Sequence, residues 1–209
     1  KGGNIGKLAV CGTINDLAAV GATPLFLSAG FIIEEGFSIE KLHLIAKSMS
    51  DVCKQTGAKI VTGDTKVVER GSADGLFINT SGIGIVSEFY NPRQAEPGDE
   101  IIITGGIAEH GTSILLDRYD LGIETGLKSD CAPMCRLING LGENLKHVKL
   151  MKDPTRGGIA TVLNEIAIEQ VLDVELDEQS IPAKSEVHAI SDILGIDPLY
   201  LACEGRMLI

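Results

Sequence analysis

This chain of 209 residues has no apolar run long enough to span a bilayer, no internal repeat at a fixed period and no low-complexity tract. It also has no C-x-x-C pair with a matching histidine pair, so a zinc site is not expected. These absences indicate a globular protein without a membrane span. The thiols are expected to be reduced and partly buried, which favours a cytoplasmic location, and they are Cys11, Cys53, Cys131, Cys135 and Cys203.

Basic side chains are scarce, with 18 Lys and Arg against 29 Asp and Glu and a net charge of −11. Because nucleic acids and anionic membranes are held chiefly by clustered Lys and Arg, this balance argues against both as partners. The P-loop and the dinucleotide G-x-G-x-x-G motif are absent as well. A small phosphate ligand is still compatible with the chain if carboxylates hold a divalent cation beside it.

Hydrophobic periodicity and turn residues predict an α+β first half followed by α/β layering. In the first half they predict a buried helix over residues 5–20, a strand over 25–33, a helix over 38–56 between Ser38 and Gly57, and strands over 59–62 and 76–86. In the second half they predict a strand over residues 100–106, helices from about 111, from Ser129 or Asp130 toward 145 and over 154–171, and a fourth over 182–194.

A polar stretch with two prolines, residues 91–98, separates these halves. We therefore expect two domains, residues 1–92 and 93–209. The chain starts without methionine and stops in an apolar stretch typical of a strand, which predicts a fragment whose second domain is incomplete.

The most informative stretch is residues 60–66, an apolar strand followed by Asp64, Thr65 and Lys66. A carboxylate, a hydroxyl and an amine at a strand end suit a metal-bound triphosphate. The alternative is an ordinary turn, since Gly-Asp-Thr is common turn chemistry.

Two further aspartates stand in unusual company. Asp16 belongs to an otherwise apolar stripe of a predicted helix, where it either bonds a neighbouring backbone N–H or has a functional partner. Asp153 precedes Gly157 and Gly158 at a predicted helix start, where exposed N–H groups favour an anion. An ordinary capped helix is the alternative there. We interpret Asp16, Asp64 and Asp153 together as one Mg²⁺ site.

Two other residues stay ambiguous at the level of sequence. Glu204 lies between apolar segments and is either a solvent-exposed bulge or a buried group with a function. His110 follows a Gly-Gly pair and could contact phosphate, but we expect a surface loop histidine.

Several motifs resemble the HypE family of hydrogenase maturation factors. They are residues 2–19, Gly30-Phe-Ile-Ile-Glu-Glu-Gly36, Thr62-Gly-Asp-Thr-Lys-Val-Val68, Phe77-Ile-Asn-Thr80, Ser129-Asp-Cys131 and Asp153-Pro-Thr-Arg-Gly-Gly158. The resemblance covers essentially the whole chain. It extends more weakly to a superfamily that includes aminoimidazole ribonucleotide synthetase, selenophosphate synthetase and thiamine monophosphate kinase.

The resemblance implies a two-domain aminoimidazole ribonucleotide synthetase-like fold whose first domain forms a homodimer by pairing strands across subunits, with ATP near that interface. It also implies a reaction. A carbamoyl group donated by HypF to a C-terminal cysteine is dehydrated, at the expense of ATP, to a thiocyanate. The cyano group then passes to HypC and HypD and becomes a ligand of the iron in [NiFe] hydrogenase.

Carried over by motif, Asp16, Asp64 and Asp153 would hold Mg²⁺, and Lys66 with Glu204 would serve the dehydration. In the ATP site that the resemblance implies, Thr65, Gly157 and Gly158 would line the phosphates.

The chain departs from the family pattern at both ends, since the glycine-rich, acidic N-terminal segment and the tail with the acceptor cysteine are absent. We therefore expect this chain alone to be catalytically inactive. Two alternatives stay open, namely another member of the superfamily with selenophosphate or ribonucleotide chemistry, and an inactive dimerisation or scaffold fragment.

Overall fold

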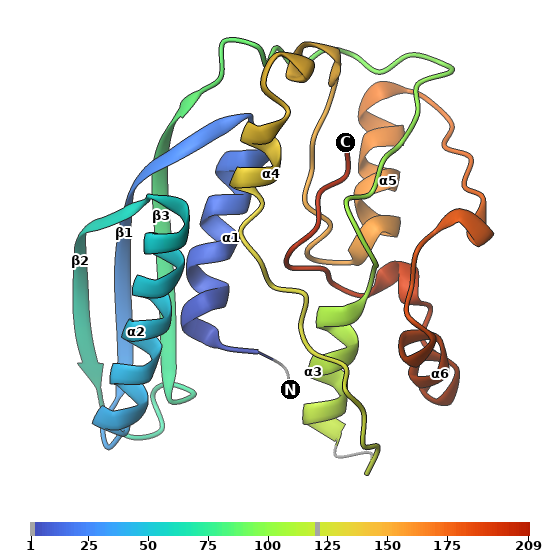
Figure 1. Ribbon diagram of the computed structural model, residues 1–209. Helices are drawn as coiled ribbons and strands as arrows, with labels where there is room; N and C mark the ends of the chain where they lie inside the picture. Colours follow the sequence, from blue (N-terminus) through green and yellow to red (C-terminus); the bar gives the residue numbers. More distant parts are fainter. Residues whose placement is uncertain (1–2, 120–121) are drawn as a thin grey trace. The chain divides into compact units, whose positions relative to one another are not determined.

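A computed structural model describes residues 3–119 and 122–209, and the chain divides into two compact units (Figure 1). The first, called the sheet unit, contains Asn4–Ser87 together with Pro133–Leu141. The second, called the helix-rich unit, contains Glu88–Ala132 and Gly142–Ile209. Each unit is described by itself.

The sheet unit is built on three strands, β1 (Ala22–Glu34), β2 (Lys59–Val68) and β3 (Leu76–Val86), in the order β2-β1-β3. The central strand β1 pairs parallel with β2 and antiparallel with β3. The prediction for β3 is confirmed. Strand β1 starts three residues earlier than predicted and includes Pro24, which was expected to lie outside it, and β2 continues well past residue 62.

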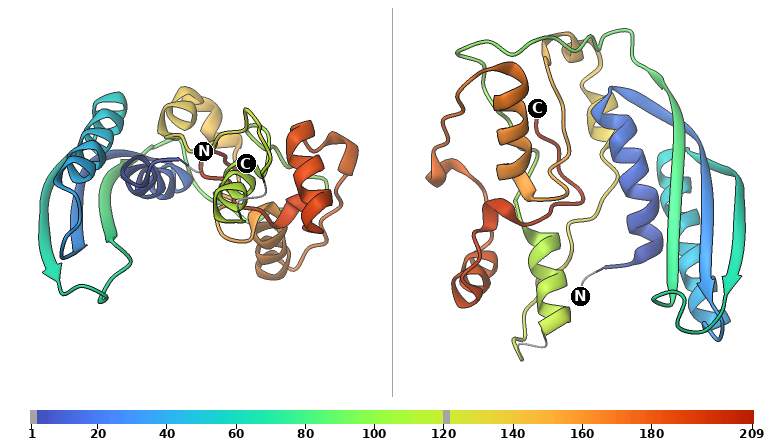
Figure 2. Two further views of the ribbon diagram at one scale, coloured as in Figure 1. Left: turned by 90° about the horizontal axis from the view of Figure 1, so that it is seen from below. Right: turned by 180° about the vertical axis from the view of Figure 1, so that it is seen from behind.

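Two helices, α1 (Ile5–Ala19) and α2 (Ile39–Thr56), cover one face of the sheet (Figures 1 and 2). The predicted ends of α2 are confirmed. The Ser38 hydroxyl accepts the Lys41 N–H, and Gly57 closes the helix at φ 82°, a conformation that favours glycine. Apolar side chains recur at helical spacing along α1 and pack against the sheet. They form the core between this helix and the sheet.

The predicted helix from Ser129 or Asp130 toward residue 145 is wrong. The chain instead forms the short helix α4 (Cys135–Gly140) and a 3₁₀ helix, η1 (Gly142–His147). The reason is a tertiary bond: the buried Asn15 side chain of α1 accepts the Met134 N–H at 2.8 Å, which joins the start of α4 to the sheet unit.

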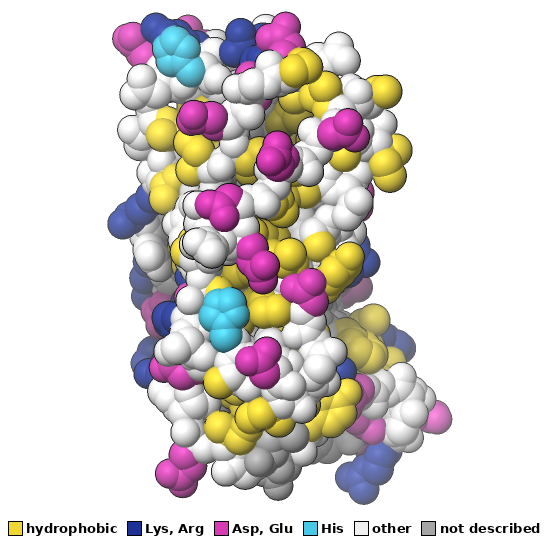
Figure 3. All heavy atoms as spheres, turned by 90° about the vertical axis from the view of Figure 1, so that its right-hand side faces the viewer, with side chains coloured by type: hydrophobic (Ala, Val, Ile, Leu, Met, Phe, Trp, Pro, Cys, Tyr) yellow, Lys and Arg dark blue, Asp and Glu magenta, His cyan; other side chains and the backbone are white. Residues whose placement is uncertain are grey.

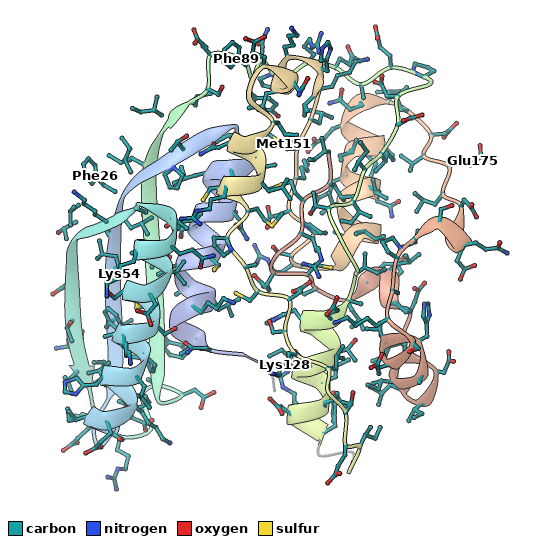
Figure 4. All side chains as sticks on the ribbon, viewed as in Figure 1. Phe26, Lys54, Phe89, Lys128, Met151 and Glu175 are labelled. Carbon is teal, nitrogen blue, oxygen red and sulfur yellow. The ribbon has the colours of Figure 1, made fainter. Side chains whose placement is uncertain are left out.

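The sheet face opposite α1 and α2 carries exposed apolar side chains. Phe26 of β1 lies on this side, away from the helices (Figure 4). On β3, Phe77, Ile83 and Ile85 are 50%, 64% and 65% exposed. Because side chains alternate along a strand, these residues share one face. We call Phe26, Phe77, Ile83 and Ile85 the open face.

The helix-rich unit contains α3 (Glu109–Tyr119), α5 (Gly158–Gln170), α6 (Ser185–Leu194) and two short 3₁₀ helices, η2 (Glu178–Ser180) and η3 (Pro198–Tyr200). Its hydrophobic core includes Ile107, Leu116, Leu163, Val187 and Leu208. The predicted helix over 182–194 is confirmed as α6.

The predicted strand over residues 100–106 is wrong as a full strand. A single antiparallel bridge joins Ile103 to Leu208, flanked by reciprocal backbone bonds between Ile102 and Ile209 at 2.9 Å. Lys152 bridges the other side of Leu208. Three extended segments therefore lie side by side here without forming regular strands.

The acidic surface and the buried thiols agree with what the amino-acid composition predicts. Asp and Glu side chains are spread along the face of the protein shown in Figure 3. All five cysteines are free and buried, which confirms the prediction for the thiols. Within residues 3–119 and 122–209, no helix is both long enough and apolar enough to cross a membrane.

Candidate functional site

Asp64, Thr65 and Lys66 lie inside β2 and not in a turn at its end, so both sequence interpretations of this stretch need correction. The strand continues because its pairing with β1 runs on to the partners Glu34 and Val68. In this register Asp64 lies beside Gly30 and Lys66 beside Ile32. Partners in register share a face, so the Asp64 carboxylate and the Lys66 amine project together.

The surroundings of Asp64 are open. Its carboxylate is exposed, and Oδ1 accepts the Thr65 N–H at 2.8 Å. Gly30 has no side chain, so no side chain of the neighbouring strand fills the space beside Asp64. A hollow next to β2 is lined by Asp64 and Thr65 with Phe31 and Met49. Thr65 is the partner of Phe31 and therefore projects from the opposite face of β2, so a ligand on the Asp64 side can reach a carboxylate and an ammonium group.

Asp16 does not lie on a buried face of α1, which corrects the prediction. The buried positions of the helix are Gly6, Val10, Ile14 and Ala18, spaced four apart, with Cys11 and Asn15 beside them. Asp16 follows on the exposed side. The stripe through Asp16 looked apolar in sequence because α1 is apolar nearly all round.

No group of three Asp, Glu, His or Cys side chains among the described residues comes together as a metal-binding cluster. Asp16 and Asp64 belong to the sheet unit, and Asp153 belongs to the helix-rich unit. The three-aspartate Mg²⁺ site therefore stays a prediction.

Asp153 does not cap α5. The helix starts four residues later than predicted, at Gly158, with Gly157 as its N-cap. The Thr155 hydroxyl donates a hydrogen bond to the Asp153 carboxylate, so this residue organises the turn before the helix.

The glycines at the start of α5 have a structural explanation within the unit. Gly157 and Gly158 adopt φ of 75° and 60°. A Cβ on Gly158 would lie 2.4 Å from the Leu199 carbonyl oxygen and 2.6 Å from that of Leu201. The space that the missing side chain leaves is thus occupied by the backbone around η3. Binding of phosphate by these glycines stays a prediction.

Glu204 is half-buried in a turn whose main chain is tightly held. The Glu204 N–H donates to Asp130 Oδ1 at 2.9 Å, and the Ala132 N–H donates to the Glu204 carbonyl oxygen at 3.4 Å. Lys66 belongs to the other unit. Its predicted pairing with Glu204 stays a prediction.

A buried ionic cluster beside this turn was missed by the sequence analysis. Glu109 of α3 binds Arg206 through Oε1 at 3.1 Å and Lys184 through Oε2 at 2.5 Å. Arg206 Nε lies 3.8 Å from Asp130 Oδ2 and donates to the Gly106 carbonyl oxygen at 2.7 Å. The available signal was the charged residues in apolar or glycine-rich company, Glu109 after Gly105-Gly106 and Arg206 before Met207.

His110 is buried in α3, so the predicted surface loop is wrong. Its Nδ1 lies 2.7 Å from the Ser129 hydroxyl, and burial lowers the pKa of the imidazole. Burial also raises the pKa of Cys203 to about 12, opposed by the Ala108 N–H that bonds its sulfur at 3.2 Å. Burial therefore favours the neutral form of both groups.

Comparison with known families assigns the class of protein. The N-terminal domain of AIR synthase related proteins matches residues 1–86, and the C-terminal domain of the same proteins matches residues 96–209. The chain therefore belongs to the AIR synthase related family, with the mixed α/β fold that was expected.

Within this family the chain is similar to HypE. It is 50% identical to the carbamoyl dehydratase HypE of Rhizobium leguminosarum bv. viciae over 99% of this chain and 60% of that protein. The HypE of Escherichia coli (strain K12) is 43% identical, with all of this chain and 62% of that protein covered. The predicted resemblance to HypE is confirmed.

Solved structures agree. A crystal structure of a HypE–HypF complex matches with a TM-score of 0.96 at 48% identity over 99% of this chain and 68% of that chain. HypE in complex with ATP matches with a TM-score of 0.94 at 42% identity over 99% of this chain and 62% of that chain. The chain spans about 60% of the length of the curated relatives it matches.

Proposed function

We propose that the protein containing this chain is an ATP-dependent carbamoyl dehydratase of [NiFe] hydrogenase maturation. The observation that carries the proposal is the 50% identity with a carbamoyl dehydratase HypE across 99% of this chain. The described geometry supports it in one respect, since Asp64 and Lys66 project from one face of β2 with open space beside them. The reaction converts a carbamoyl group on a C-terminal cysteine to a thiocyanate, the source of the iron-bound cyanide.

ATP is the proposed co-substrate, and a HypE relative has been crystallised with it. In nucleotide sites Mg²⁺ is commonly held by one or two carboxylates plus phosphate oxygens, so a cluster of three acidic side chains is not required in the free protein. The exposed Asp64 carboxylate fits that donor set best. We propose it as the main ligand, with Asp16 and Asp153 as further ones. Bound Mg²⁺ would neutralise phosphate charge.

Phosphorylation is needed because the amide oxygen is a poor leaving group. The γ-phosphoryl group passes to that oxygen, ADP leaves, and the C–O bond then breaks with release of phosphate while both N–H protons are lost to form C≡N. We propose that Glu204 accepts a proton in this step and that the Lys66 ammonium stabilises the negative charge that develops on the leaving oxygen. Thr65, Gly157 and Gly158 would donate hydrogen bonds to phosphate.

The proposed partners follow the same relatives. A HypE relative has been crystallised in complex with HypF, which supports HypF as a partner. HypF would donate the carbamoyl group, and HypC with HypD would accept the cyano group. A homodimer would bury the open face, whose Phe77, Ile83 and Ile85 are otherwise in water. A cytoplasmic location agrees with five free thiols.

The test uses a full-length protein that carries this chain, carbamoylated on its terminal cysteine. Addition of Mg²⁺ and ATP should remove one water from that cysteine, detected by mass spectrometry, together with one phosphate released. Glu204→Gln should abolish the loss of water. A wild-type protein that hydrolyses ATP and phosphorylates another substrate, with the carbamoyl group intact, would overturn the proposal.

A further inference from the structure

The turn that carries Glu204 is fixed against the segment 130–132. Besides the two backbone bonds of Glu204, Gly205 approaches so closely that a Cβ would lie 2.1 Å from the Asp130 carbonyl oxygen and 2.7 Å from the Ala132 nitrogen. Such an approach is compatible only with glycine. The position of the Glu204 backbone is therefore set by Asp130 and its neighbours.

Asp130 is itself an unusual residue for such a role. Its side chain is fully buried, and only one of its oxygens, Oδ1, has a hydrogen-bond partner among the described residues. That partner is the Glu204 N–H. A buried carboxylate loses its hydration, so it is retained only where charges or hydrogen bonds compensate for that loss. Burial raises the pKa of Asp130, and the Glu204 N–H and Arg206 oppose the rise.

The compensation comes from Arg206, two residues beyond Glu204. Arg206 Nε lies 3.8 Å from Asp130 Oδ2, while its Nη2 binds Glu109 of α3. The Arg206 Nη1 donates to the Gly205 carbonyl oxygen at 2.8 Å. The Glu204 N–H and the Arg206 side chain therefore both contact the Asp130 carboxylate. Glu109 connects Arg206 to helix α3.

We propose that Asp130 is a positioning residue that fixes the Glu204 carboxylate for dehydration by binding the Glu204 main-chain N–H. This inference rests on the role of Glu204 in the proposed function. A purely structural role of Asp130 would instead lower stability and affect all steps alike.

The first test compares two substitutions in the full-length protein. Asp130→Ala removes the acceptor, so kcat for loss of water should fall about 10- to 100-fold, because a displacement of about 1 Å at a reacting group has that effect. KM for ATP should stay within about twofold, since ATP binds before this step. Asp130→Asn retains an oxygen acceptor at the same place and should restore kcat to within about threefold of wild type. An Asn variant as slow as the Ala variant would contradict the hydrogen-bond mechanism.

A second substitution keeps the inference testable where Asp130→Ala fails to fold. Gly205→Ala changes no charge but forces the turn away from Asp130, and it should lower kcat with KM for ATP unchanged. Gly140→Ala is the matched control, because a Cβ there meets nothing within 4 Å.

Glu204→Gln separates the two possible failures. If Glu204→Gln is inactive while Asp130→Ala and Gly205→Ala keep the wild-type kcat, the positioning role is overturned and the proposed function stands. If Glu204→Gln itself keeps the wild-type kcat, the role of Glu204 in the proposed function is overturned.

Discussion

In the sheet unit the acidic residues Asp16 and Asp64 are exposed, whereas in the helix-rich unit Glu109 and Asp130 are buried. The sheet unit keeps its shape through regular strand pairing and apolar packing, and these two carboxylates lie at its surface. The helix-rich unit instead uses charged groups and close backbone contacts to hold irregular segments together. The same residue types therefore have different physical roles in the two halves of one chain.

The largest expected effect tests the close backbone contacts of the helix-rich unit. Gly158→Ala should destabilise the protein by about 4 kcal/mol, from a left-handed φ of 60° and overlap with the carbonyl oxygens of Leu199 and Leu201. Gly142→Ala is the control, because Gly142 has φ of 50° but open space around its Cβ position, so about 1 kcal/mol is expected. Denaturant unfolding measures both, and equal losses would refute the contact.

The next largest effect on stability is expected from the buried carboxylate of Glu109. Glu109→Gln leaves Arg206 and Lys184 without their carboxylate, so the free energy of unfolding should fall by about 3 kcal/mol. Glu96→Gln breaks the exposed ion pair with Lys149 and should lower it by less than about 1 kcal/mol. A Glu109→Gln variant as stable as Glu96→Gln would mean that the buried cluster contributes little.

The open face of the sheet unit gives a third test. Ile83→Lys places a charge on this face and should weaken the proposed homodimer about 50-fold, equivalent to about 2.3 kcal/mol. Ile168→Lys changes a residue of α5 that is also exposed and should leave the dimer intact. Sedimentation equilibrium measures both. Equal dissociation constants for the two variants would remove the open face as the interface.

At neutral pH the smallest effect is that of Cys203, which appears as a pH dependence of stability only in alkaline solution. The folded-state pKa of Cys203, about 12, lies above its ordinary value of 9.0, so the native state holds this proton more strongly than the unfolded state. Its contribution to stability is complete below pH 9 and is lost as pH rises from 9 toward 12, by up to about 1.4 kcal/mol per pH unit. Cys203→Ala should reduce this slope. An unchanged slope would show that the thiol is not the group responsible.

Within the sheet unit, the sequence predicted features with local causes better than features with distant ones. The ends of α2 depend on Ser38 and Gly57, which act locally, and β3 has a regular apolar pattern. The end of β2 depends on pairing with β1, and the start of α4 depends on a bond to Asn15, which is distant in sequence. Long-range contacts of this kind leave no local pattern.

The candidate site was predictable in its residue types and less so in its surroundings. Asp64 and Lys66 were predicted as site residues because polar groups follow an apolar strand, and they do share a face. The exposure of Asp16 and the burial of His110 were both mispredicted, because periodicity does not tell which side of an element faces the core when both sides are mixed.

The most direct measurement of the central claim is the affinity of the full-length protein for ATP with Mg²⁺, by isothermal titration calorimetry. Asp64→Asn should weaken binding about 100-fold, equivalent to about 2.7 kcal/mol. Asp74→Asn, an exposed aspartate in the loop before β3, should bind within about twofold of wild type. Equal affinities for wild type and Asp64→Asn would contradict the account.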